Sequence, residues 1–146
     1  KLEGQYVDTN YAADIVEDAT AFGIMASTSI SGFDLSAAYN HLADNATGFV
    51  GWNSLYTNQW NTTVANQYLG EDIDAFKVAA ATTIMNIAAE VSYADYDNDS
   101  HELDVILGYD FTDAIDAGIV YTNTQSTVWD PNTDVNQLEL YVNYKF

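Results

Sequence analysis

The chain has 146 residues and a formal net charge of −19, with 22 acidic residues against 3 lysines and arginines, so it fits one domain, residues 1–146, that we expect to bind no nucleic acid. It has no cysteine and one proline, which excludes a disulfide framework. No run of about 18 apolar residues is present, which excludes a transmembrane helix.

The first part of the chain contains three runs in which apolar and polar side chains alternate, as in β-strands with one apolar face. The first run, around Leu2 to Tyr11, is the weakest, and its change of phase near Tyr6-Val7 has two interpretations, a β-bulge or a mistaken strand assignment. Phe22 to Ile30 and Phe33 to Asn40 alternate regularly. They meet at Ser31-Gly32, which predicts a two-residue hairpin turn.

The second half of the chain repeats the same pattern. Phe76 to Ile84 and Ile87 to Ala94 are joined by a tight link at Met85-Asn86. Leu103 to Phe111 and Ala114 to Asn123 are joined by another at Thr112-Asp113. The last run places its apolar residues at Leu138, Leu140, Val142, Tyr144 and Phe146.

About eight strands of roughly ten residues each have the length that crosses a bilayer at a tilt. Tight links alternate with looser ones at Ala12 to Glu17, Ala43 to Glu71, Asp97 to Ser100 and Gln125 to Asp134. Short turns on one side and longer loops on the other are typical of outer-membrane barrels. Aromatic residues gather near both strand ends, as interfacial girdles do. The chain is therefore predicted to be all-β, an antiparallel transmembrane β-barrel in the bacterial outer membrane, with membrane lipid around it.

A soluble β-sandwich or barrel is the alternative, because any half-buried antiparallel strand alternates. Three features count against it. The polar face has few large residues to fill a core, the apolar face is almost free of charge, and the last strand ends at Phe146 without a tail.

The polar face carries carboxylates where a barrel has its interior. The predicted pore-lining acids are Asp34, Glu90, Asp104, Asp110, Asp116 and Glu139, and the predicted pore-lining basic residues are Lys77 and Lys145. Unpaired carboxylates in a dry interior would each cost several kcal/mol, roughly, so water must reach them. Since eight strands enclose only enough space for side chains, we expect the chain to be the C-terminal part of a larger barrel. A complete small barrel with its acids at the rims remains the alternative.

The segment from Ala43 to Glu71 is too long for a hairpin turn and contains several aromatic residues. It has two interpretations: an outer loop that narrows the pore or contacts another subunit, or a loop that is simply exposed. No catalytic residue, metal site or cofactor is predicted. His41 and His101 are far apart, and neither a Gly-x-Ser-x-Gly stretch nor a phosphate loop occurs.

Three stretches suggest a family: Val105-Ile106-Leu107-Gly108-Tyr109-Asp110-Phe111-Thr112-Asp113, Gly51-Trp52-Asn53-Ser54-Leu55-Tyr56, and Leu140-Tyr141-Val142-Asn143-Tyr144-Lys145-Phe146. With them the chain resembles the C-terminal portion of bacterial outer-membrane porins, namely the Campylobacter-type major outer membrane proteins and the OprD-like porins. The resemblance implies a channel, often a homo-trimer, and assigns Tyr144 and Phe146 to the signal read by the barrel-assembly machinery. The chain departs from OprD-like porins in lacking their basic ladder, which puts transport of amino acids and other carboxylates in doubt.

The predicted function is therefore an outer-membrane porin, a water-filled diffusion channel for small solutes that prefers cations because its lining is acidic. It is not expected to be an enzyme. The alternative is a complete eight-stranded outer-membrane barrel with an adhesin or structural role through its outer loops.

Overall fold

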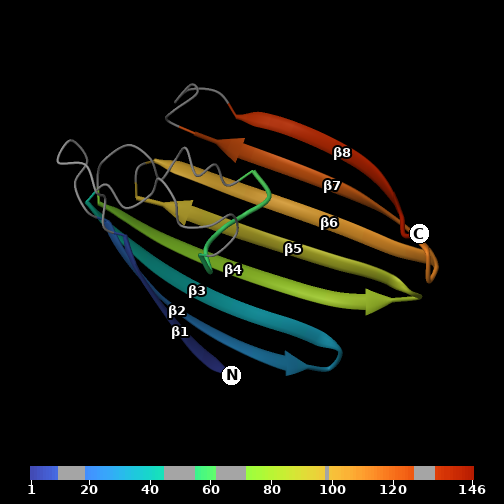
Figure 1. The fold of residues 1–146 in the computed structure, drawn as a ribbon, viewed down its shortest axis with the longest axis horizontal. Helices are drawn as coiled ribbons and strands as arrows, with labels where there is room; N and C mark the ends of the chain where they lie inside the picture. The colour runs from blue at the N-terminus through green and yellow to red at the C-terminus, as the bar shows by residue number, and fades with distance from the viewer. Residues whose placement is uncertain (10–18, 45–54, 62–71, 98, 127–133) are drawn as a thin grey trace.

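The fold is one antiparallel sheet. A computed structural model describes residues 1–9, 19–44, 55–61, 72–97, 99–126 and 134–146. The eight strands are β1 (Leu2–Thr9), β2 (Ala19–Ile30), β3 (Phe33–Asp44), β4 (Ile73–Ile84), β5 (Ile87–Tyr96), β6 (Ser100–Thr112), β7 (Ile115–Gln125) and β8 (Val135–Tyr144). Each strand pairs with its sequence neighbour, in the order β1 to β8 (Figure 1). Eight antiparallel strands are thus confirmed. The described sheet is open, with β1 and β8 at its two edges.

The described residues include no helix with the length and apolar composition needed to cross a membrane. The predicted segments Ala12 to Glu17 and Gly51 to Ser54, and most of Gln125 to Asp134, lie outside the described residues.

Three tight hairpins lie at one end of the sheet, together with the C-terminus (Figure 1). Ser31 and Gly32 have φ values of 52° and 84°, and Met85 and Asn86 have 52° and 66°. Two consecutive positive φ angles are typical of the type I′ turn, whose twist matches that of the paired strands. The hairpins at Ser31-Gly32 and Met85-Asn86 are therefore where the sequence predicted them.

Two local predictions were wrong. The β1–β2 register runs without interruption from Leu2 to Thr9, so no bulge interrupts the pairing at Tyr6-Val7. The irregularity lies instead between Asp110 and Thr112 in the β6–β7 pair. There the Thr112 hydroxyl accepts hydrogen bonds from the backbone N–H groups of Ala114 (3.2 Å) and Ile115 (3.1 Å), which moves the turn one residue on from the predicted link.

The two faces of the sheet differ in chemistry and in exposure. Strand pairing places the apolar alternation of every strand on one face, which we call the apolar face, and its side chains are exposed. Leu140 and Val142, for example, are 70% and 73% exposed. The opposite, polar face contains the buried residues. These include a small apolar cluster at the loop end of β2 to β5: Ala21, Leu42, Leu55, Ile73, Ala75, Ala94 and Tyr96.

Candidate functional site

All the predicted lining residues within the strands lie on the polar face. Cross-strand pairing aligns three of the acids in one row, since Asp34 pairs with Ala81, Ala81 with Glu90, Glu90 with Ile106, and the row continues through Val120 to Glu139. Lys77 and Asp104 lie on the same face in rows nearer the loop end. The structure thus brings the predicted carboxylates together on one surface.

The remaining predicted residues gather at the tight-turn end of this face. Asp110 and Asp116 face each other across the β6–β7 pair. Lys145 Nζ lies 3.6 Å from Asp116 Oδ1, and Asn143 Nδ2 donates to Asp116 Oδ2 at 2.7 Å. One cation and one amide therefore offset the repulsion between the two carboxylates.

A short segment of the long β3–β4 connection crosses the polar face, in front of β4 to β6 in Figure 1. We call residues 55–61 the strap. At its start the backbone N–H groups of Tyr56 and Thr57 donate to Gln5 Oε1 of β1 (2.9 Å) and Asn40 Oδ1 of β3 (3.1 Å). The described part of Ala43 to Glu71 is therefore packed on the sheet.

The middle of the strap is held by β4, β5 and β6. Lys77 Nζ donates to the Asn58 carbonyl at 2.6 Å, so its ammonium group binds the backbone of the strap. The Gln59 side chain donates to the Glu102 carbonyl (3.1 Å) and accepts from the Ser92 hydroxyl (2.8 Å). Because Thr57 and Gln59 are buried, these contacts fix the strap as part of the fold.

The end of the strap is held by carboxylates. The Trp60 N–H donates to Asp104 Oδ2 at 2.7 Å, and the Asn61 N–H donates to Glu102 Oε1 at 2.6 Å. Glu102 and Asp104 are each 1% exposed. Two backbone donors partly offset the cost of burying these carboxyl groups. Asp104 Oδ1 has no hydrogen-bond partner among the described residues.

Side chains of the strap also reach the far edge of the sheet. Trp60 Nε1 donates to Glu139 Oε2 of β8 (3.2 Å), and Asn61 Nδ2 donates to Thr122 Oγ1 of β7 (2.8 Å). The strap thus contacts both edge strands of the described sheet, β1 through Gln5 and β8 through Glu139. It lies against a sheet whose strands curve in Figure 1.

An aromatic stack supports the strap near β8. The rings of Trp60 and Tyr141 are nearly parallel, with centroids 6.5 Å apart and 12° between their planes. The Tyr141 ring covers Gly118, where a Cβ atom would lie 2.3 Å from Tyr141 Cζ. The absence of a side chain at Gly118 therefore makes room for the stack.

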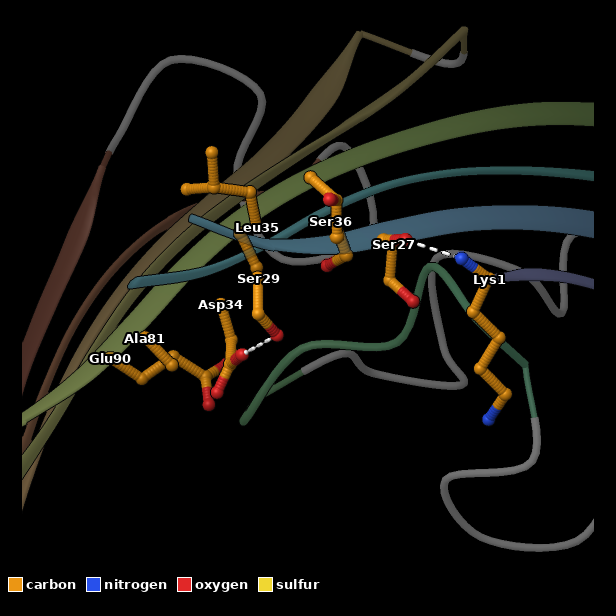
Figure 2. Close-up of a pocket in the computed structure, with 10 residues that line it drawn as sticks. Lys1, Ser27, Ser29, Asp34, Leu35, Ser36, Ala81 and Glu90 are labelled. Carbon is orange, nitrogen blue, oxygen red and sulfur yellow. Dashed lines mark hydrogen bonds between the residues drawn. The ribbon is translucent and has the colours of Figure 1, made fainter. Parts of the chain in front are cut away.

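The tight-turn half of the polar face is hollow. One cavity of about 500 Å³ is lined by Lys1, Ser27, Asp34 and Glu90, among others, and both carboxylates point into it (Figure 2). The Ser29 hydroxyl donates to Asp34, and the N-terminal amino group of Lys1 donates to the Ser27 carbonyl at 2.7 Å. Acids at this end thus lie beside open space, while those under the strap are enclosed.

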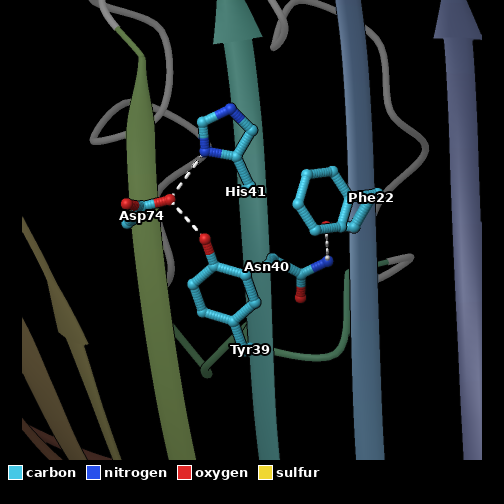
Figure 3. A network of polar contacts seen from close by, with 5 residues as sticks. All are labelled: Phe22, Tyr39, Asn40, His41 and Asp74. Carbon is cyan, nitrogen blue, oxygen red and sulfur yellow. Dashed lines mark hydrogen bonds and ion pairs between the residues drawn. The ribbon is translucent and has the colours of Figure 1, made fainter.

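At the loop end, the apolar face gives way to polar residues. Tyr39 OH donates to Asp74 Oδ1 at 2.7 Å, and His41 Nδ1 lies 2.6 Å from the same oxygen (Figure 3). These hydrogen bonds, first that from Tyr39 and then that from His41, lower the pKa of Asp74 below its ordinary value. Asp74 lies beyond the apolar band, toward the loop side of Phe76 on β4.

The sequence did not reveal two features of this site: Glu102, and the packing of the strap on the polar face. Glu102 continues the alternation of β6 backwards from Asp104, so extending the predicted strand by one residue before Leu103 would have included it. The strap has no such signal, because its hydrogen bonds reach several strands, including three to β6, without a repeating pairing pattern.

A scan against protein-family models finds no match for this chain, and neither does a search of curated proteins. The arrangement itself offers a curved, acidic, partly hollow surface on one side of the sheet and an exposed apolar surface on the other. Such a surface can attract and orient cations.

Proposed function

We propose that the chain forms part of the wall of a porin in the bacterial outer membrane, a water-filled channel that passes small solutes and prefers cations. One observation supports this above the rest: the leucine-, isoleucine- and tyrosine-bearing face is exposed, while Glu102 and Asp104 are enclosed on the other. A soluble sheet buries its apolar face. The inverted arrangement suits hydrocarbon outside and water inside.

The distribution of aromatic residues supports a transmembrane orientation. On the apolar face Phe33, Tyr109 and Tyr144 lie toward the tight-turn end, and Tyr39 and Tyr121 lie toward the loop end. Aromatic girdles at both interfaces are typical of such barrels. In this proposal the tight turns face the periplasm, and Tyr144 and Phe146 supply the signal to the assembly machinery.

The proposal requires closure by further strands. Open sheet edges are not tolerated in lipid, because their N–H and C=O groups would lack partners. Direct pairing of β1 with β8 would give an eight-stranded barrel, whose interior holds side chains only. Here the interior must also hold the backbone of the strap, with Thr57 and Gln59 buried beneath it. We therefore propose a larger barrel whose added strands pair with β1 and β8.

Selection among ions follows from the charges on the polar face. Its described acids are Glu3, Asp34, Glu90, Glu102, Asp104, Asp110, Asp116 and Glu139. Its lysines are Lys1, whose ammonium group pairs with Glu3 at 2.8 Å, Lys77 and Lys145, so acids outnumber bases on this face. A hydrated lumen with this lining lowers the energy of cations and raises that of anions. The mechanism needs no catalytic step.

Planar-bilayer recording of the full-length protein tests the proposal. Under a KCl gradient we expect the sign of the reversal potential to show that K⁺ permeates more readily than Cl⁻. On a gel, an unboiled sample should migrate differently from a boiled one. Anion preference would contradict the electrostatic argument. A folded, heat-modifiable protein without conductance would favour the small adhesin-type barrel, and a protein that stays monomeric without detergent would favour a soluble sheet.

A further inference from the structure

A second cavity, of about 450 Å³, lies on the polar face below the strap. Its lining includes Asp34, Ala81, Glu90, Ile106, Gly108 and Tyr141. No atom lies within 4 Å of the position where a Cβ of Gly108 would be, so the cavity is open beside Gly108. A volume of this size is typical of small-molecule sites. We call this space the Glu90 cavity.

Its charge is negative. The Asp34 carboxylate accepts a hydrogen bond from Ser29, and no hydrogen bond or ion pair engages the Glu90 carboxylate among the described residues. No described lysine or arginine lines the cavity. Two adjoining cavities that Glu90 also lines each contain a lysine. Lys77 lines the one of about 320 Å³, where its ammonium group donates to the Asn58 carbonyl, and Lys1 lines the one of about 500 Å³, where its ammonium group pairs with Glu3 at 2.8 Å. An occupant of the Glu90 cavity therefore meets two carboxylates, while both neighbouring lysines are engaged by other groups.

Tyr141 and Ile106 add an aromatic and an aliphatic side chain to a lining that, apart from the two carboxylates, is made of small residues and two threonines. The Tyr141 ring is held in place between Gly118 below it and Trp60, with which it stacks. Ile106 lies on the central row with Glu90 and also lines the adjoining 320 Å³ cavity beneath Trp60. An aromatic face attracts a cation through its quadrupole, and the attraction is greatest when the cation is poorly hydrated.

Building on the proposed channel, we infer that the Glu90 cavity is a binding subsite for small organic monocations, such as alkylamines or quaternary ammonium compounds. Glu90 and Asp34 supply the countercharge, while Tyr141 and Ile106 contact the apolar body of the ligand. Inorganic cations gain only the attraction to the two carboxylates. Amino acids are disfavoured, because their carboxylate would approach two acids without a basic partner.

Choline is the probe, and the full-length protein is measured in two ways. Saturation-transfer NMR in detergent reports choline binding without requiring conduction, and bilayer recording reports block of the K⁺ current by choline. We expect binding in the millimolar range, saturable block, and no comparable effect of a neutral sugar such as glucose.

Two variants separate charge from shape. Glu90→Gln keeps the side-chain volume and removes the charge, and we expect choline binding to weaken about tenfold. Tyr141→Leu removes the ring, and we expect choline binding to weaken about fivefold. Tyr141→Phe should bind like the parent protein. Asp113→Asn is the charge control, because Asp113 lies in the exposed β6–β7 turn, away from the cavity.

The outcomes distinguish the subsite from the channel. If choline binding is unchanged in both Glu90→Gln and Tyr141→Leu, or if glucose binds equally well, the subsite assignment is wrong even in a conducting protein. If Tyr141→Leu fails to fold, as gel migration would reveal, the isosteric Glu90→Gln decides. Choline binding that depends on Glu90 in a protein without conductance supports the subsite and contradicts the channel. Neither binding nor conductance would overturn both.

Discussion

The two faces of this sheet alternate residue by residue along the same strands, yet their side chains meet different surroundings. On the apolar face Leu138 and Leu140 are 66% and 70% exposed, whereas on the polar face Thr122 and Asp104 are each 1% exposed. The difference comes from the strap, which covers only the polar face, near its loop end. Alternation alone thus identifies two faces, but the position of the covering segment shows which face is enclosed.

The largest effect is expected when an arginine is placed on the apolar face and compared with an arginine on the polar face. Leu107→Arg places a charge on the apolar face of β6, and in lipid vesicles it should lower the free energy of unfolding by about 2–4 kcal/mol. Ala88→Arg, on the exposed part of the polar face, should change it by less than about 0.5 kcal/mol and reduce cation preference. Urea unfolding in vesicles measures the first effect. A neutral result for Leu107→Arg would mean that the apolar face does not contact hydrocarbon.

Two paired glycines of the polar face allow a sharper contrast. Gly118→Ala places a methyl group 2.3 Å from Tyr141 Cζ and should displace the ring from its stack with Trp60, at a cost of about 1–3 kcal/mol in unfolding free energy. Gly108→Ala, its cross-strand partner with nothing within 4 Å, should be neutral or slightly stabilising. Equal effects of the two substitutions would argue against the stack.

The bonds of the strap to β7 and β8 should have a smaller effect. Asn61→Ala removes hydrogen bonds to Thr122 (2.8 Å) and Gln137 (3.1 Å) and should cost about 1–2 kcal/mol. Thr122→Val keeps the side-chain shape and removes one partner. If the bond forms, the double variant should cost less than the sum of the two single changes, which unfolding measurements can test. Strict additivity would mean that Asn61 does not contact Thr122.

The smallest effect concerns the loop end of the apolar face. Because the folded-state pKa of Asp74 is lowered, its contribution to stability is present above its unfolded pKa of about 3.8 and is lost as the pH falls through the folded value. Asp74→Asn should therefore destabilise the protein by less than about 1 kcal/mol at pH 7, since the site is exposed, and the difference should vanish in strong acid. Asp113→Asn serves as the exposed control. A difference that grows on acidification would contradict the assigned hydrogen bonds from Tyr39 and His41.

The alternation predicted the strands and the faces because both depend on a period of two, which local sequence carries. It placed Asp34, Glu90 and Glu139 on one face, and pairing then put them in one row. It missed the β6–β7 irregularity, since nothing in the alternation of Asp110 to Thr112 distinguishes it. The alternation did not decide between the two interpretations of Ala43 to Glu71. The contacts of the strap join residues up to 79 positions apart, as between Trp60 and Glu139, and no local pattern reports such contacts.

Those long-range contacts have a consequence for the order of assembly. Every strand pairs with its neighbour in the chain, so the sheet can grow strand by strand, with the connection between β3 and β4 as the longest loop to close. The strap belongs to the connection between β3 and β4, yet Asn61 and Trp60 find their partners on β7 and β8. Its docking must therefore wait for the last hairpin. The polar face would be covered by the strap only after all eight strands had paired. An incomplete sheet would therefore leave the strap undocked and accessible to proteases.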